Sequence, residues 1–235
     1  RRRQRQMCIR DSLQVVHGLS PLFAALYALP TVLGTVAGAT LAGVLAERVR
    51  PAVLLTAGLV VGAAGFGAVA AVEADTHLAV FVGGYTVVTL GIGIVATLAN
   101  TLILATAPPE RAGAAAGVSE TSTELGAALG IATLGTVASS VYRSTMAGTA
   151  PDTGTAAGET VAGAASTAAD LPPREAASLL SAAFEAYTAG VNTAAATGSG
   201  TLLVIALVAA VSLRRLPAGA RNEPADPGPG DPARV

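Results

Sequence analysis

The sequence has little charge, few aromatic side chains and one cysteine. Its 235 residues include no tryptophan, 3% aromatic residues and 12% charged residues, and all of its basic side chains other than the two histidines are arginine. The lone Cys8 excludes an internal disulfide and a cysteine zinc cluster. A net charge of −1 gives no basic surface for a nucleic-acid partner.

What the sequence does contain is apolar and small. Hydrophobic residues make up 52% of the chain, 27 residues are glycine, and the mean hydropathy is +0.60. This composition leaves too little polar surface for a soluble domain, so we expect the lipid bilayer to be the solvent.

Five apolar stretches are long enough to cross a bilayer, whose core of about 30 Å takes roughly 20 helical residues. They cover residues 21–46, 51–72, 78–107, 112–142 and 190–213. We therefore predict an all-α fold, a polytopic transmembrane helix bundle with about five complete spans. Glycines such as Gly34 and Gly38 in the first span, and Gly58, Gly62 and Gly65 in the second, predict close helix contacts.

The other segments are polar or rich in proline. Residues 143–189 are rich in Thr, Ser, Asp, Glu and Pro, which predicts a long extracellular loop with a surface helix over 174–187. The stretch 217–235 predicts a disordered cytoplasmic tail. The opening RRRQRQMCIRDS, residues 1–12, resembles translated sequencing-adapter read-through, and we interpret it as non-native. The alternative is a genuine basic arm.

Arginine marks the side of the membrane that each connection occupies. Arg48, Arg50 and Arg111, followed by Arg214, Arg215 and Arg221, fall on one side, and arginine accumulates in cytoplasmic loops. This predicts a multi-pass protein of the plasma membrane with a cytoplasmic C-terminus. The Arg-rich opening conflicts with that orientation. If the opening is an artefact, the native chain is cut upstream of Leu13, and residues 13–216 form the transmembrane unit.

Two carboxylates lie inside the fourth span. Glu120 and Glu124 are about 12 and 18 Å along the helix from Ala112, near the midplane, and share one helix face. Burial and a like-charged neighbour favour a neutral carboxyl that ionises when water or a cation arrives, as a proton carrier requires. The alternative is that one glutamate hydrogen-bonds to Ser119, Thr123 or a neighbouring span and only locks packing. Asn100, deep in the third span, is either a substrate or carboxyl contact or an interhelical polar contact.

Two stretches resemble a known family. Gly43-Val44-Leu45-Ala46-Glu47-Arg48-Val49-Arg50 resembles the Gly-x-Leu-Ala-acid-Arg loop signature of the major facilitator superfamily. From spacing alone, the favoured interpretation of Glu47, Arg48 and Arg50, which follow Gly43-Val44-Leu45-Ala46, is a solvated positive anchor. The run from Pro108 to Arg143, including Ser-Glu-Thr-Ser-Thr-Glu from Ser119, resembles the fourteen-span drug:proton antiporters, in particular EmrB/QacA-like multidrug and quaternary-ammonium exporters.

The resemblance covers residues 13–216 and implies the C-terminal half of that fold, with the missing N-terminal half as a partner. It implies proton-coupled export of lipophilic cationic drugs, with Glu120 and Glu124 binding the cation and coupling protons. Asn100, Ser119 and Thr123 are expected to line the cavity, although some members have an acid where this chain has Ser119. No cofactor or metal is implied, and no nucleophile or phosphate loop suggests an enzyme. A transporter of another metabolite or antibiotic and a non-transporting membrane scaffold remain as alternatives.

Overall fold

The structure is a computed structural model that describes residues 21–72, 78–149 and 154–213. Every element in these ranges is helical. In chain order they are α2 (Pro21–Ala46), α3 (Pro51–Ala70), α4 (Leu78–Thr106), the 3₁₀ turn η1 (Pro109–Arg111), α5 (Ala112–Thr149), α6 (Gly154–Glu159), α7 (Val161–Ala168) and α8 (Pro173–Leu213). The expectations for residues 1–12 and 217–235 concern segments outside the described residues.

Five of the described helices, α2, α3, α4, α5 and α8, are long and apolar enough to cross a membrane. This confirms the predicted all-α bundle of five spans. The first three helices begin and end within two residues of the predicted bounds. Pro51 begins α3 because proline lacks the N–H that a first helical residue leaves unpaired, and Pro108-Pro109 separates α4 from α5.

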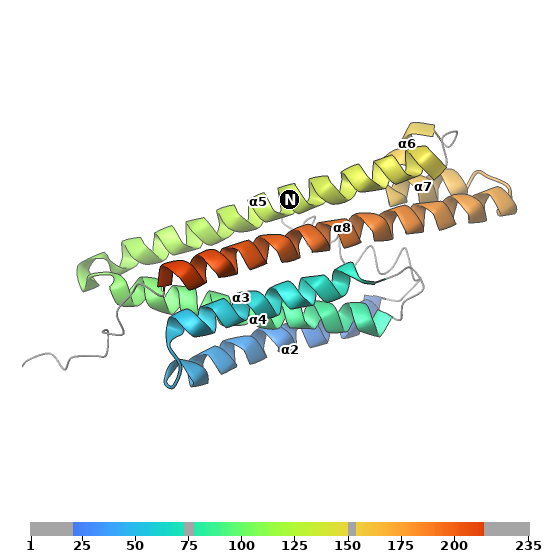
Figure 1. Ribbon diagram of the computed structural model, residues 1–235. Helices are drawn as coiled ribbons and strands as arrows, with labels where there is room; N and C mark the ends of the chain where they lie inside the picture. Colours follow the sequence, from blue (N-terminus) through green and yellow to red (C-terminus); the bar gives the residue numbers. More distant parts are fainter. Residues whose placement is uncertain (1–20, 73–77, 150–153, 214–235) are drawn as a thin grey trace, which may run out of the picture.

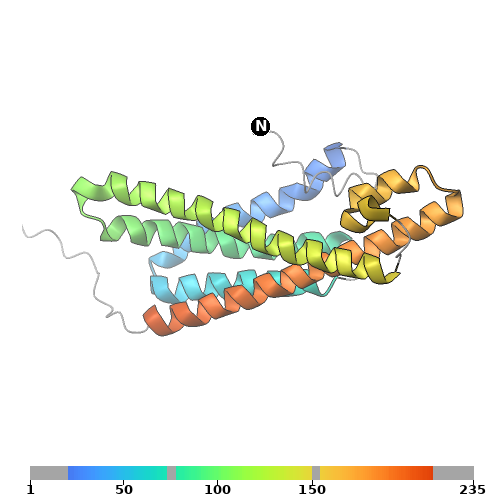
Figure 2. The same cartoon turned by 90° about the horizontal axis from the view of Figure 1, so that it is seen from above.

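The helices form a row in which α2 packs on α4, α4 on α3, α3 on α8 and α8 on α5 (Figures 1 and 2). Successive spans run in alternating directions. The connection after α2, the turn η1 and the C-terminal end of α8 consequently lie at one end of the bundle. We call this the arginine end, because it holds Arg48, Arg50 and Arg111.

Glycine allows α3 and α4 to approach closely. A Cβ atom on Gly65 would lie 2.5 Å from the Val88 nitrogen, and one on Gly91 would lie 2.5 Å from the Gly62 nitrogen. A Cβ atom on Gly34 of α2 would lie 2.7 Å from the Thr86 carbonyl oxygen on α4. No side chain fits at these points, so the predicted packing through small residues is confirmed.

The predicted loop over 143–189 is wrong in its secondary structure. Helix α5 continues to Thr149, and the expected surface helix is the first part of α8, which runs unbroken from Pro173 to Leu213. The segment is polar by composition but rich in alanine, the best helix former, and its small side chains pack closely. Whether it lies outside the membrane remains a prediction.

We call residues 142–189 the helical cap. Within their described part, the ends of α5 and α8 enclose α6 and α7 at the end of the bundle opposite the arginine end (Figure 1). Met146 and Leu179 are buried there among alanine methyl groups. The Tyr142 hydroxyl donates a hydrogen bond of 2.9 Å to the Ala157 carbonyl oxygen, and Thr160 caps α7 by accepting from the Gly163 nitrogen at 3.0 Å. The cap is therefore a packed unit with a core of its own.

Helices α5 and α8 are much longer than a bilayer is thick. They contain 38 and 41 residues, which correspond to about 57 and 62 Å at about 1.5 Å per residue, against a hydrocarbon core of about 30 Å. Both project from the cap end of the bundle, and their projecting ends carry α6 and α7.

Candidate functional site

A polar contact joins α4 to α5 on the arginine-end side of the bundle. The Ser119 hydroxyl donates a hydrogen bond of 2.8 Å to the Asn100 amide oxygen. One turn further along α5, the Thr123 hydroxyl donates to the Ser119 carbonyl oxygen at 2.9 Å. The structure thus brings together the three predicted cavity-lining residues, and it gives Asn100 the interhelical contact that was one of its two interpretations.

Glu120 and Glu124 stand beside this contact on α5, and both are exposed. Within the described ranges, no hydrogen bond or ion pair engages either carboxylate. The Ser119 hydroxyl bonds Asn100 and the Thr123 hydroxyl bonds its own helix, so neither serves as a packing partner for a glutamate. The structure therefore gives no support to the interpretation of these carboxylates as packing contacts.

The stretch of α5 that carries the two carboxylates is open on most of its circumference. A methyl group added at Gly113, Gly117, Gly126 or Gly130 would meet no atom of a neighbouring helix within 4 Å. Further along, α5 closes onto α8, where a Cβ atom on Gly190 would lie 2.7 Å from the Ala138 carbonyl oxygen. The carboxylates thus lie on a free helix surface, with the Ser119–Asn100 contact as their neighbour.

The depth of the pair follows from helix geometry. If the bilayer begins at Ala112, Glu120 and Glu124 lie about 12 and 18 Å into a core of about 30 Å. Asn100 lies about 9 Å from the end of α4 at Thr106, which agrees with its contact to Ser119. A charged carboxylate at this depth costs about 2.5 to 3.5 kcal/mol on insertion scales, so a proton, a cation or water must accompany it.

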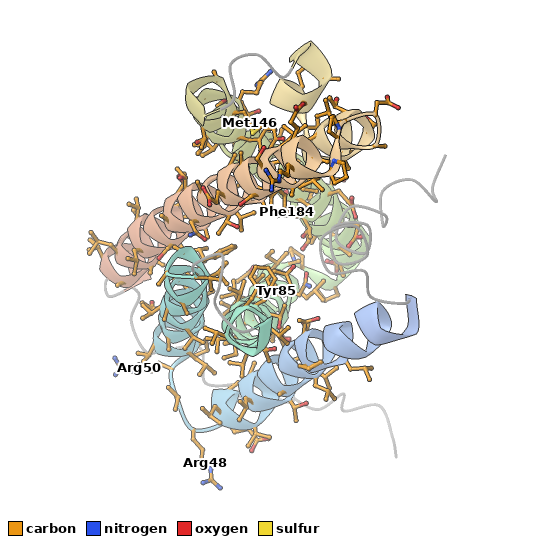
Figure 3. The ribbon with its side chains drawn as sticks, turned by 90° about the vertical axis from the view of Figure 1, so that its right-hand side faces the viewer. Arg48, Arg50, Tyr85, Met146 and Phe184 are labelled. Carbon is orange, nitrogen blue, oxygen red and sulfur yellow. The ribbon has the colours of Figure 1, made fainter. Side chains whose placement is uncertain are left out.

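The residues of the predicted loop signature lie at the arginine end, far from the carboxylates. Gly43, Glu47, Arg48 and Arg50 lie on or near the surface, and the Val49 nitrogen closes the turn by donating to the Leu45 carbonyl oxygen at 2.8 Å. Arg48 and Arg50 point away from the bundle (Figure 3). The structure does not bring this group into contact with Glu120 or Glu124.

Two residues that sequence reasoning missed tie α8 to α3 and to the residues directly after it. The Asn192 amide donates to the Val72 carbonyl oxygen at 2.6 Å, and the Ser199 hydroxyl donates to the Ala63 carbonyl oxygen at 2.8 Å. The two side chains are seven residues apart, two helical turns, and so share one face of α8. The sequence signal that could have identified them is the presence of two polar side chains, two helical turns apart, within an apolar span.

Among the described residues, no three His, Cys, Asp or Glu side chains lie close enough together to hold a metal ion.

A row of five long apolar helices, with arginines gathered at one end, is the architecture of a polytopic membrane protein. Residues 11–131 match the family model of the Major Facilitator Superfamily. Because this match covers half of the chain, the protein belongs to the major facilitator superfamily, a superfamily of membrane transporters.

Several characterised proteins are similar in sequence. The "Multidrug efflux pump LfrA" of Mycolicibacterium smegmatis is 39% identical over 211 residues, which are 88% of this chain and 42% of that protein. The "Methyl viologen resistance protein SmvA" of Salmonella typhimurium is 28% identical over 205 residues, 86% of this chain and 41% of that protein. The "Tetracenomycin C resistance and export protein" of Streptomyces glaucescens is 30% identical over 128 residues, 54% and 24% of the two chains. The chain thus spans less than half the length of these relatives.

Proposed function

We propose that this chain is the C-terminal half of a fourteen-span drug:proton antiporter of the EmrB/QacA type, which exports lipophilic cations across the plasma membrane. The observation that carries the proposal is the pair Glu120 and Glu124, exposed on α5 beside the Ser119–Asn100 contact. Membership of the superfamily and similarity to proteins named for multidrug efflux and for methyl viologen resistance support it.

The pair provides a mechanism for exchanging a cation against protons. Carboxylates at i and i+4 lie about 5 to 6 Å apart at their Cβ atoms and repel one another when both are charged. A charge in the hydrocarbon core is unfavourable without a partner, so protons or a cation would accompany the pair. A drug cation that enters supplies the compensating charge and displaces a proton, and a proton that returns displaces the drug. Drug and proton thus compete for the same oxygens.

The neighbouring polar residues position the pair. The Ser119–Asn100 bond fixes α5 against α4 one residue before Glu120, and the Thr123 hydroxyl lies one residue before Glu124. Asn100, Ser119 and Thr123 would line the same cavity, with rocking of two helix bundles opening it to each side in turn.

Orientation follows from the arginine end. The connection after α2 carries Arg48 and Arg50, η1 carries Arg111, and both lie at this end of the bundle. Positively charged connections remain cytoplasmic. This orientation places the C-terminal end of α8 inside the cell and the helical cap outside.

A second candidate is a transporter of the same fold for an antibiotic that is not cationic. It is favoured by the similarity to the tetracenomycin C resistance and export protein. A panel containing ethidium, methyl viologen and tetracenomycin C separates the two, because the cation exporter lowers the accumulation of the first two compounds only. A scaffold would not export any of them.

The decisive experiment places residues 13–216 in a whole transporter. In a chimera, they replace the matching segment of LfrA, and proton-driven ethidium transport is followed in everted vesicles. Glu120→Gln and Glu124→Gln are each expected to abolish transport, whereas Glu110→Gln, an exposed carboxylate in η1, leaves it unchanged. Unchanged transport in both α5 variants would refute coupling by this pair.

A further inference from the structure

The cap contains a pocket that the proposed transport cycle does not use. It lies where α5 and α8 leave the bundle and meet the connection between α6 and α7, and its volume is about 190 Å³. Polar groups enter it from three helices and the connecting residue, and its remaining walls are apolar. Its polar lining consists of Ser139, Tyr142, Glu159, Thr160 and Tyr187. We call it the cap pocket.

The two tyrosines of the cap pocket come from different helices. Tyr142 on α5 is only 4% exposed, and its hydroxyl is held by the Ala157 carbonyl oxygen. Tyr187 on α8 is 37% exposed. One ring thus belongs to the fixed inner wall and the other reaches solvent. Aromatic faces attract cations, and aromatic rings are the usual receptors for quaternary ammonium groups.

The charge of the cap pocket has one sign. Glu159 is its single ionisable group other than the tyrosines, and no arginine lines it. In the described part of the chain, no ion pair neutralises the Glu159 carboxylate. The whole cap, residues 142–189, carries five acidic residues against two arginines, a net charge of −3. Such a field raises the local concentration of cations.

The same lining argues against a metal ion. Calcium requires six to eight oxygen ligands, usually with several carboxylates, and magnesium requires near-octahedral geometry. One carboxylate and two aromatic rings in a largely apolar pocket suit an organic cation instead.

We propose that the cap pocket binds an organic cation, with the charged head group between the tyrosine rings and the Glu159 carboxylate. The site is separate from the α5 carboxylates, because Tyr142 lies 22 residues beyond Glu120, about 33 Å along the helix at about 1.5 Å per residue. The inference stands on the residues of the pocket and does not require that the chain transport anything.

Binding of radiolabelled phenyltrimethylammonium to the whole chain in lipid nanodiscs tests the site. The background carries Glu120→Gln and Glu124→Gln, so that the midplane carboxylates contribute no binding. We expect saturable binding in this background, and roughly tenfold weaker binding with Glu159→Gln, from loss of the charge partner. Glu175→Gln is the matched control, since it removes an exposed cap carboxylate outside the pocket, and it should change the Kd less than twofold.

The aromatic contribution is tested at Tyr187. Tyr187→Phe keeps the ring and should retain binding within twofold, whereas Tyr187→Leu should weaken it about fivefold. Unlabelled tert-butylbenzene, which has the same shape without the charge, should not compete.

Any one of four results would overturn the proposal. If Glu159→Gln left binding unchanged, the Glu159 carboxylate would not be part of the site. If Glu175→Gln weakened binding as much as Glu159→Gln, the cation would be attracted by the overall negative charge of the cap and not held at a site. If tert-butylbenzene competed, the pocket would be an apolar crevice that does not select for charge. Absence of any binding in the Glu120→Gln/Glu124→Gln background would also overturn it, whatever the transport assay shows. Conversely, failure of the transport assay leaves the expected binding intact.

Discussion

The Ser119 hydroxyl on α5 and the Asn100 amide oxygen on α4 lie 2.8 Å apart in a hydrogen bond. This bond joins α4 to α5 next to Glu120 and Glu124. No neighbouring helix approaches α5 closely at Gly117 or Gly126, so this bond is a side-chain contact in a stretch of α5 that is otherwise loosely packed.

Removing either partner should loosen α5 by a measurable amount. Ser119→Ala and Asn100→Ala in a double-mutant cycle are expected to show a coupling energy of about 0.6 kcal/mol, typical of side-chain hydrogen bonds between membrane helices. Unfolding of the whole chain in detergent gives the four stabilities. Thr101→Ala is the control partner, because the Thr101 hydroxyl bonds Thr97 within α4 and its effect should simply add to that of Ser119→Ala. An additive Ser119/Asn100 pair would contradict the contact.

The approach of α3 to α4 depends on the absence of a side chain at Gly65. Gly65→Ala places a methyl group 2.5 Å from the Val88 nitrogen and 2.9 Å from the Gly84 carbonyl oxygen. Backbone atoms cannot move aside cheaply, so we expect a loss of about 1 to 3 kcal/mol. Gly67→Ala on the same helix is the control, since its nearest atom would be the Ser199 hydroxyl at 3.8 Å. It should be neutral or stabilising because alanine favours the helix. Equal stability of the two variants would show that close packing at Gly65 is not required.

The hydroxyl of Tyr142 holds the cap to α5. Tyr142→Phe leaves the carbonyl oxygen of the buried Ala157 without its donor, at a cost of about 1 to 3 kcal/mol. Amide hydrogen exchange should therefore rise about fivefold or more in α6, while α3 and α4 exchange as before. Tyr85→Phe, half-buried on α4 and stacked on Phe81, is the control and should leave α6 unchanged. Unaltered exchange in Tyr142→Phe would mean that apolar packing around Met146 holds the cap without this bond.

Hydropathy and proline positions were enough to predict the bundle, because each span is an apolar run bounded by features such as Pro51 and Pro108. The cap was missed for a physical reason. Its alanine, serine and threonine residues form no long apolar run, yet alanine is the best helix former. Alanine methyl groups become a core only when helices bring them together, as Ala164 and Ala183 do around Met146. Composition does not carry that information.

The sequence predicted how the candidate site residues are arranged along one helix, but not their contacts between helices. The spacing of Glu120 and Glu124 follows from the helical repeat. The bond from Ser119 to Asn100 spans nineteen residues and depends on how α5 turns back along α4 after η1. The links of Asn192 and Ser199 to α3 span more than a hundred residues and depend on the order of packing in the row.

The arginines predict which end of the bundle is cytoplasmic, and labelling of introduced thiols tests that prediction. In a background where the single cysteine is replaced by Cys8→Ser, Arg48→Cys marks the arginine end and Glu175→Cys marks the cap. Both positions are exposed, so access is decided by the membrane and not by burial. A membrane-impermeant maleimide added to intact cells should label Glu175→Cys and spare Arg48→Cys.

The same reagent added to everted vesicles should reverse the pattern, because arginine-rich connections stay on the cytoplasmic side. Labelling after detergent solubilisation gives the full signal for each variant and controls for thiol reactivity. If Arg48→Cys were labelled from outside, the cap would be cytoplasmic, and a cation in the cap pocket would meet the transporter from inside the cell. That outcome would contradict the predicted orientation but would leave the pocket itself in place.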